Sequence, residues 1–102
     1  MVITGGCRNG TLSLRFQGEL DHHAAREAMS ALSERIDAFL PARCVVDLRG
    51  LTFMDSSGIA LLLRAEKLMG ELGGSLSVSG VQEQPLRVLR AAGLEKRIPI
   101  TE

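Results

Sequence analysis

Apolar and polar residues alternate near the start of the chain, in the pattern of a half-buried strand. Leu12, Leu14 and Phe16 are separated by single polar residues, so one face of this segment is apolar. The preceding Asn9-Gly10 pair is the strongest short-range hairpin signal in the sequence, because both residues tolerate the positive φ angles of a tight turn. We therefore expect residues 2–7 to form an antiparallel partner strand, at a sheet edge because two adjacent glycines weaken it.

The next segment has the spacing of an amphipathic helix. Asp21 is placed to cap its start, and Pro41 prevents a further turn after about Leu40. Apolar residues recur at steps of three and four, which predicts a buried face formed by Ala25, Ala28, Leu32, Ile36 and Phe39.

Two more helices are expected further along the chain. One begins near Ser56 or Ser57 and ends at Gly73-Gly74, which serve as a C-terminal stop. The other covers residues 85–92, with a proline in its first turn and Gly93 just past its end.

Short strands separate these helices, and together they predict the fold class. We expect strands at Cys44–Leu48, around residues 76–78 and at residues 98–100, where apolar and β-branched residues gather. The expected order is β-β-α-β-α-β-α-β in a single domain over residues 1–102. Helical crossovers favour parallel connections, and the hairpin adds an antiparallel pair. The prediction is an α/β fold with a mixed four- to five-stranded sheet and helices packed on it.

Composition narrows the classes of function. Twelve basic and twelve acidic residues give a net charge of zero, and there is no Trp or Tyr, so the sequence does not favour direct nucleic-acid binding. The longest apolar run is far too short to span a membrane, and the N-terminus lacks a secretory signal. We therefore expect a cytoplasmic protein without a membrane partner, whose two cysteines, Cys7 and Cys44, stay reduced and bind no metal.

The segment Asp55-Ser56-Ser57-Gly58 carries the most information about function. It lies between a predicted strand and a predicted helix, the place where functional loops gather in α/β sheets. A helix N-terminus has free N–H groups and a partial positive charge, so Ser56 is placed where a phosphate is tolerated. The simpler interpretation is that these residues only cap the helix.

A catalytic role for Ser56 is the alternative from another class. The nucleophile elbow needs glycine two residues before and two after the serine, but Met54 occupies the first of these positions. Only His22 and His23 are available as a base, and hydrolase folds of that type are much larger. We therefore predict that the chain is not an enzyme.

Two further groups of residues have simple structural interpretations. His22 and His23 are adjacent, so on a helix they point about 100° apart and do not easily share a metal ion. Arg87, Arg90 and the Lys96-Arg97 pair make the last quarter locally basic, which is typical of a solvated face.

The motifs resemble those of a known family. Gly18-Glu19-Leu20-Asp21-His22-His23, followed by Phe53-Met54-Asp55-Ser56-Ser57-Gly58, closely resembles the bacterial anti-sigma factor antagonists of the STAS family, in particular the sporulation branch. The resemblance extends over nearly the whole chain. Many relatives add a C-terminal helix after the last strand, so we expect one face of the sheet to be less covered here.

The resemblance implies a function in transcription regulation. The unphosphorylated antagonist binds an anti-sigma factor that is also a serine kinase, and so releases the sigma factor. The kinase switches the antagonist off by phosphorylating the first serine of the motif, here Ser56, and a PP2C-like serine phosphatase restores it. This chain would need no cofactor, because ATP and Mg²⁺ belong to the kinase.

The same resemblance assigns the partner-binding residues. Asp21, His22 and His23 would lie near the docking surface with Ser57, Asp55 would orient the Ser56 hydroxyl, and Gly58 would admit the backbone of the partner. Alternatives are a STAS module of a general stress or other signalling circuit, a small serine enzyme, or a ligand-binding module.

Overall fold

The computed structural model describes residues 1–102 and contains one sheet with three α-helices. The elements follow the chain in the order β1 (Val2–Arg8), β2 (Thr11–Leu20), α1 (His22–Phe39), β3 (Arg43–Met54), α2 (Ser56–Glu71), β4 (Ser75–Ser79) and α3 (Glu83–Ala91), with a short 3₁₀ helix at Leu94–Lys96. The predicted α/β fold class is confirmed.

The sheet is mixed, as predicted, and its strands lie in the order β1-β2-β3-β4. β1 and β2 are antiparallel, and the two pairs formed by β3 are parallel. Asn9 and Gly10 have φ angles of 52° and 79°, which is the positive pair that a type I′ hairpin requires. The last predicted strand is reduced to a single parallel bridge between Val78 and Ile100.

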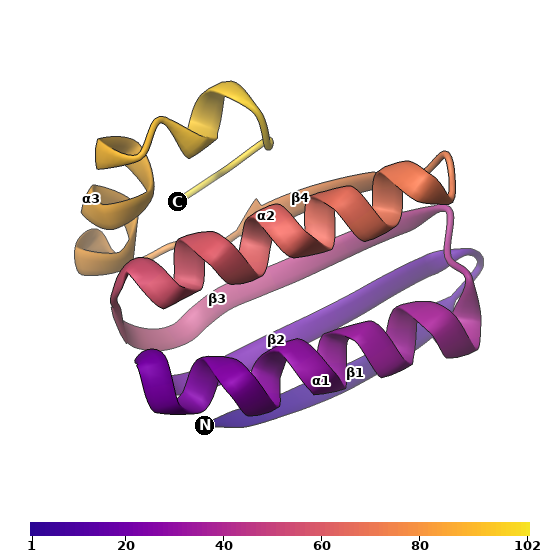
Figure 1. Ribbon diagram of the computed structural model, residues 1–102, viewed down its shortest axis with the longest axis horizontal. Helices are drawn as coiled ribbons and strands as arrows, with labels where there is room; N and C mark the ends of the chain where they lie inside the picture. The colour runs from indigo at the N-terminus through magenta and orange to yellow at the C-terminus, as the bar shows by residue number, and fades with distance from the viewer.

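Two helices cover one face of the sheet. α1 and α2 lie side by side across the strands, and both begin at the same end of the sheet (Figure 1). Their apolar sides pack on the inward residues of the strands, and residues such as Leu14, Val46 and Val78 are almost completely buried. The other face of the sheet is polar, and Arg15 and Asp47 form an ion pair across it at 3.3 Å. None of the helices combines the length and the apolarity needed to cross a bilayer.

Three expectations about local structure were inaccurate. β3 continues to Met54, six residues past its predicted end, because its pairing with β2 resumes after a register shift. α3 begins at Glu83 rather than Pro85, which is compatible with proline because the first helical turn needs no N–H donors. Phe39 is 50% exposed rather than buried, because it is the last residue of α1 and the chain turns away at Leu40, whose φ angle is 45°.

Candidate functional site

The first turns of α1 and α2 meet at one edge of the sheet. β2 ends at Leu20 and β3 ends at Met54, and these neighbouring parallel strands each lead directly into a helix. The backbone N–H of Asp55 donates to the carbonyl of Leu20 at 3.2 Å, which holds the two strand ends together. The segment that begins at Gly18 and the segment that begins at Phe53 are therefore brought to the same place, although their starts are more than thirty residues apart in the sequence.

Each helix has an aspartate cap. The Oδ1 atom of Asp21 accepts from the backbone N–H of Ala24 at 2.8 Å, and this hydrogen bond is the main reason why the pKa of the Asp21 carboxyl is lowered. In α2, the Oδ1 atom of Asp55 accepts from the backbone N–H of Ser57 at 2.8 Å. The predicted capping role of both residues is confirmed.

Asp55 also holds the other helix, a role that the sequence did not predict. Its second oxygen, Oδ2, accepts from the backbone N–H of His22 at 2.9 Å. One carboxylate therefore binds an N–H group at the start of both α1 and α2, where the partial positive charges of the two helices favour a negative group. We call this arrangement, which consists of Asp55 with the N–H groups of His22 and Ser57, the Asp55 brace.

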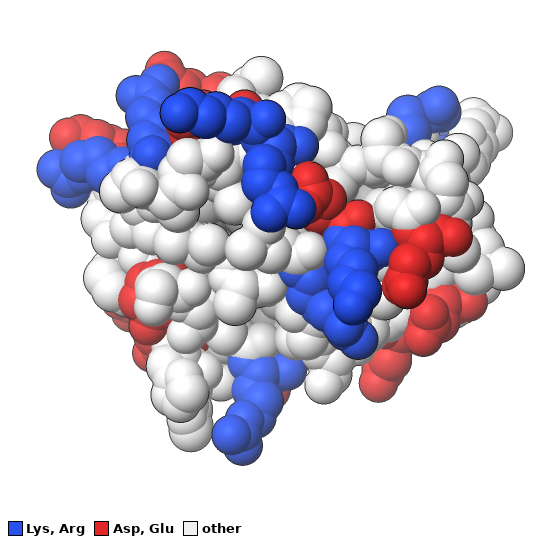
Figure 2. Space-filling model, turned by 45° about the horizontal axis from the view of Figure 1, so that its top comes forward, with Lys and Arg blue, Asp and Glu red and all other residues white.

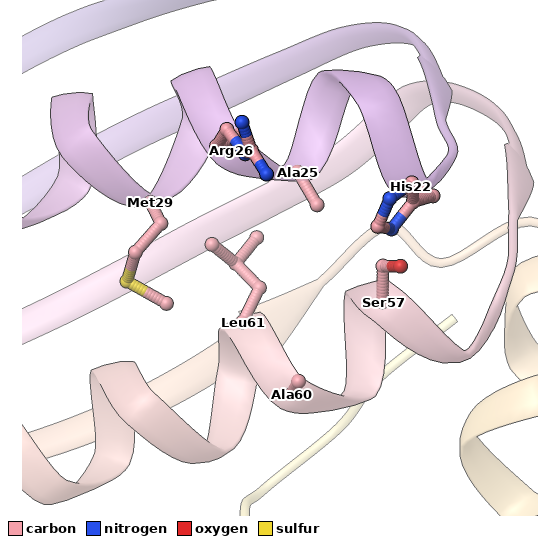
Figure 3. Close-up of a pocket in the computed structure, with 7 residues that line it drawn as sticks. All are labelled: His22, Ala25, Arg26, Met29, Ser57, Ala60 and Leu61. Atoms are coloured by element: carbon pink, nitrogen blue, oxygen red, sulfur yellow. The ribbon is translucent and has the colours of Figure 1, made fainter.

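Ser56 is the first residue of α2 and is exposed, whereas Ser57 is half-buried. An outside enzyme can therefore reach the Ser56 hydroxyl without any part of the core opening. Its phosphorylation stays a prediction. The Ser57 hydroxyl faces the ring of His22 across the space between the helices (Figure 3).

Gly58 has a role inside the chain. It is buried, and a methyl group at this position would lie 2.5 Å from the Cγ atom of Met54. The absence of a side chain is thus explained by the packing of Met54 beneath the first turn of α2. The expectation that Gly58 admits the backbone of a partner has no support in this position, and we leave Gly58 out of the docking surface.

Gln84 fixes the segment that precedes the motif. Its Oε1 atom accepts from the N–H of Met54 at 2.8 Å, and its Nε2 atom donates to the carbonyl of Met54 at 3.0 Å. The side-chain amide thus satisfies both backbone groups at the end of β3, as a neighbouring strand would. The sequence offered no local signal for this contact, because thirty residues separate the two partners.

The histidines and the basic residues of the last quarter lie at the surface. His22 and His23 are both exposed, and no group of three or more His, Cys, Asp or Glu side chains is arranged to hold a metal ion. Arg87, Arg90 and Arg97 each form an ion pair with a glutamate. Basic and acidic side chains are interspersed over the face shown in Figure 2, rather than forming one positive surface.

Comparisons with known proteins agree with this geometry. A model of the STAS domain family matches residues 3–102. The chain is 37% identical over 91 residues to the anti-sigma F factor antagonist of Paenibacillus polymyxa, and the match covers 89% of this chain and 78% of that protein. The structure is also similar to that of the anti-sigma factor antagonist SpoIIAA in its unphosphorylated form, with a TM-score of 0.84 at 24% identity, over 99% of this chain and 89% of the other. For Bacillus SpoIIAA in the phosphorylated form, the TM-score is 0.75 at 24% identity, over 99% and 92% of the two chains.

Proposed function

Because the chain belongs to the STAS domain family, we propose that it acts as an anti-sigma factor antagonist and that phosphorylation of Ser56 switches it off. The observation that carries this proposal is the exposed hydroxyl of Ser56 at the start of α2, inside the Asp-Ser-Ser-Gly motif. SpoIIAA, which shares the fold, has been solved in both an unphosphorylated and a phosphorylated form.

In the proposed cycle, the unphosphorylated chain binds an anti-sigma factor that has serine kinase activity, and the bound sigma factor is released. The kinase then transfers the γ-phosphoryl group of ATP to the Ser56 hydroxyl and ends the interaction. A PP2C-like serine phosphatase hydrolyses the phosphoserine and returns the chain to its active form. The nucleotide and metal chemistry belongs to these two enzymes, so this chain only presents the serine and the surface around it.

The position of Ser56 explains how a phosphate can act on binding without unfolding the chain. Phosphorylation adds about −1.5 to −2 charges, which are tolerated at the positive end of a helix. The same charges weaken docking on a partner surface that fits the neutral hydroxyl, because the phosphate must lose its bound water when the partner docks. The added charge also increases the negative charge beside the Asp55 carboxylate. Each loss of about 1.4 kcal/mol in binding free energy lowers the affinity tenfold.

The proposed docking surface contains residues from both helix starts. Asp21, His22 and His23 come from the α1 end and are exposed, while the α2 end contributes Ser56 and Ser57, with Asp55 between the two. Phe53, an aromatic residue that is 37% exposed, lies at the end of β3 just before this surface. Exposed aromatic side chains are common anchors in protein interfaces.

The likeness to an anti-sigma F factor antagonist favours a sporulation circuit over a general stress circuit. The direct test uses the purified anti-sigma F factor of Paenibacillus polymyxa with ATP. We expect stoichiometric phosphorylation of the wild-type chain at Ser56, unchanged labelling of Ser57→Ala, and no labelling of Ser56→Ala, which still binds. Stoichiometric phosphorylation of Ser56→Ala at Ser57 would show that the wrong serine has been assigned.

The alternative that the chain is a serine enzyme predicts a different reaction with serine-directed reagents. The only observation in its favour is that the His22 ring faces the Ser57 hydroxyl in Figure 3, and no hydrogen bond joins them. Rapid stoichiometric labelling of either serine by a fluorophosphonate would support an enzyme. We expect no such labelling, because neither hydroxyl has the hydrogen-bonded base of an activated nucleophile.

A further inference from the structure

A groove runs between α1 and α2 and opens beside the proposed docking surface. Its volume is about 260 Å³, and four of its seven lining residues are hydrophobic. Its walls come from both helices, and the lining consists of His22, Ala25, Arg26, Met29, Ser57, Ala60 and Leu61. Met29 and Leu61 point toward one another from opposite helices, while His22 and Ser57 face each other at one end (Figure 3).

The size and lining of the groove restrict what it can hold. Sites for small molecules usually have volumes of ~300–1,000 Å³, so this groove is small for such a ligand. The His22 ring and the Ser57 hydroxyl lie at one end of the groove, and its apolar part is formed by Ala25, Met29 and Leu61, with Arg26 on the α1 wall. A single apolar side chain fits this combination better than a polar metabolite.

Arg26 adds a charge to the lining of the groove. It is exposed and takes part in none of the four ion pairs of the structure. An unpaired guanidinium beside an apolar groove is complementary to a partner segment in which a carboxylate residue is the neighbour of an apolar residue.

We propose that the groove receives one apolar side chain of the anti-sigma factor, and that Arg26 pairs with a carboxylate next to that side chain. This inference rests on the proposed function, because the groove shares His22 and Ser57 with the proposed docking surface. It goes further by naming where the partner inserts a side chain and what chemistry its contact segment has.

The Asp55 brace gives this groove a fixed width at the end where the partner docks. The His22 N–H and the Ser57 N–H are bound to the same carboxylate, so the first turns of the two walls cannot separate without breaking a hydrogen bond. A preformed groove of this kind lowers the cost of binding, since little side-chain or backbone ordering is needed.

Filling the groove tests the proposal. Ala60 lines the groove and is exposed, so Ala60→Leu adds bulk there with little effect on the core. Ala38 is an exposed alanine near the other end of α1, outside the groove, and Ala38→Leu is the matched control. We expect Ala60→Leu to weaken binding of the Paenibacillus polymyxa anti-sigma F factor about tenfold or more in calorimetry, and Ala38→Leu to bind like the wild type.

The charge of Arg26 is tested by the salt dependence of the same binding. Arg26→Ala should lower the affinity by about tenfold at low salt, and the difference from the wild type should shrink as salt is raised. Arg26→Lys should recover part of the loss, because it keeps the charge without the planar fork.

The outcomes separate this inference from the proposed function. If the wild type binds and Ala60→Leu binds equally well, the groove is not occupied, while the antagonist function stands. If Ala38→Leu weakens binding as much as Ala60→Leu, the effect is not local and the groove is again rejected. If the wild type shows no binding, the proposed function fails and this inference fails with it.

Discussion

The Asp55 brace leads to a prediction about the stability of the fold. Asp55 uses one carboxylate oxygen for the N–H of Ser57 and the other for the N–H of His22. Asparagine has the same shape but only one acceptor oxygen, so Asp55→Asn can keep one of these hydrogen bonds and must lose the other. We expect the cap of Ser57 to be kept, because it is formed within two residues, and the bond to His22 to be lost.

The expected size of the effect follows from the geometry. A net hydrogen bond to a charged group contributes ~1.5–3 kcal/mol, and replacing an N-cap residue costs ~0.5–2 kcal/mol. Because the His22 N–H lies near solvent, we take the lower values, so Asp55→Asn should lower the free energy of unfolding by about 1.5 kcal/mol. Asp55→Ala loses both bonds and should lower it by about 2 kcal/mol. A loss of about 1 kcal/mol lowers Tm by ~4–8 °C in a domain of this size.

Urea unfolding followed by circular dichroism gives the change in free energy, and amide hydrogen exchange shows which bond was lost. Protection of the His22 amide should fall in Asp55→Asn while protection of the Ser57 amide remains. Asp21→Asn is the matched control, because Asp21 uses only one oxygen, which asparagine also provides; it loses a charge at the start of a helix but no hydrogen bond, so its free energy of unfolding should fall less than that of Asp55→Asn. Wild-type stability in Asp55→Asn, with the His22 amide still protected, would refute the brace.

Two other predictions concern the core and its packing. Gly58→Ala should lower the free energy of unfolding by about 1 kcal/mol, because the cost of crowding Met54 (~1–3 kcal/mol) exceeds the gain in helix propensity (~1 kcal/mol). Gly70→Ala, in the same helix but facing open space, should raise it by ~0.5–1 kcal/mol. Burial raises the pKa of the Cys44 thiol from 9.0 to about 11, so the contribution of this thiol to the free energy of unfolding should be constant well below pH 9 and should fall by up to about 2–3 kcal/mol between pH 9 and 11.

Urea unfolding also checks these predictions. Equal effects of the two glycine substitutions would mean that contact with Met54 does not limit the residue at position 58. For the thiol, the unfolded chain ionises first as the pH rises, and this favours unfolding. Cys44→Val lacks this ionisation and should show a smaller decline between pH 9 and 11, so parallel curves for the variant and the wild type would contradict the assignment.

Features set by neighbouring residues could be predicted from the sequence. The Asn9-Gly10 hairpin follows from the φ angles that these residues accept, and the start of α1 follows from the cap at Asp21. The exposed position of Ser56 follows in the same way, because a helix that begins immediately after an aspartate cap presents its first residue. These signals are local, so no knowledge of the tertiary fold was needed.

Features set by distant partners could not be predicted. The second hydrogen bond of Asp55 and both hydrogen bonds of Gln84 join residues that are thirty or more positions apart. The full length of β3 depends on pairing with β2 across a register shift, rather than on its own apolar pattern. The groove between α1 and α2 arises only when the two helices are placed side by side on the sheet.

The most direct test compares the affinity of one anti-sigma factor for the two forms of the chain. The anti-sigma F factor of Paenibacillus polymyxa is titrated calorimetrically with unphosphorylated chain and with chain phosphorylated stoichiometrically at Ser56, after circular dichroism has shown that both are folded. We expect the phosphorylated form to bind at least about a hundredfold more weakly, which corresponds to ~2.7 kcal/mol. Equal affinities of the two folded forms would contradict the idea that a charge at the start of α2 controls docking.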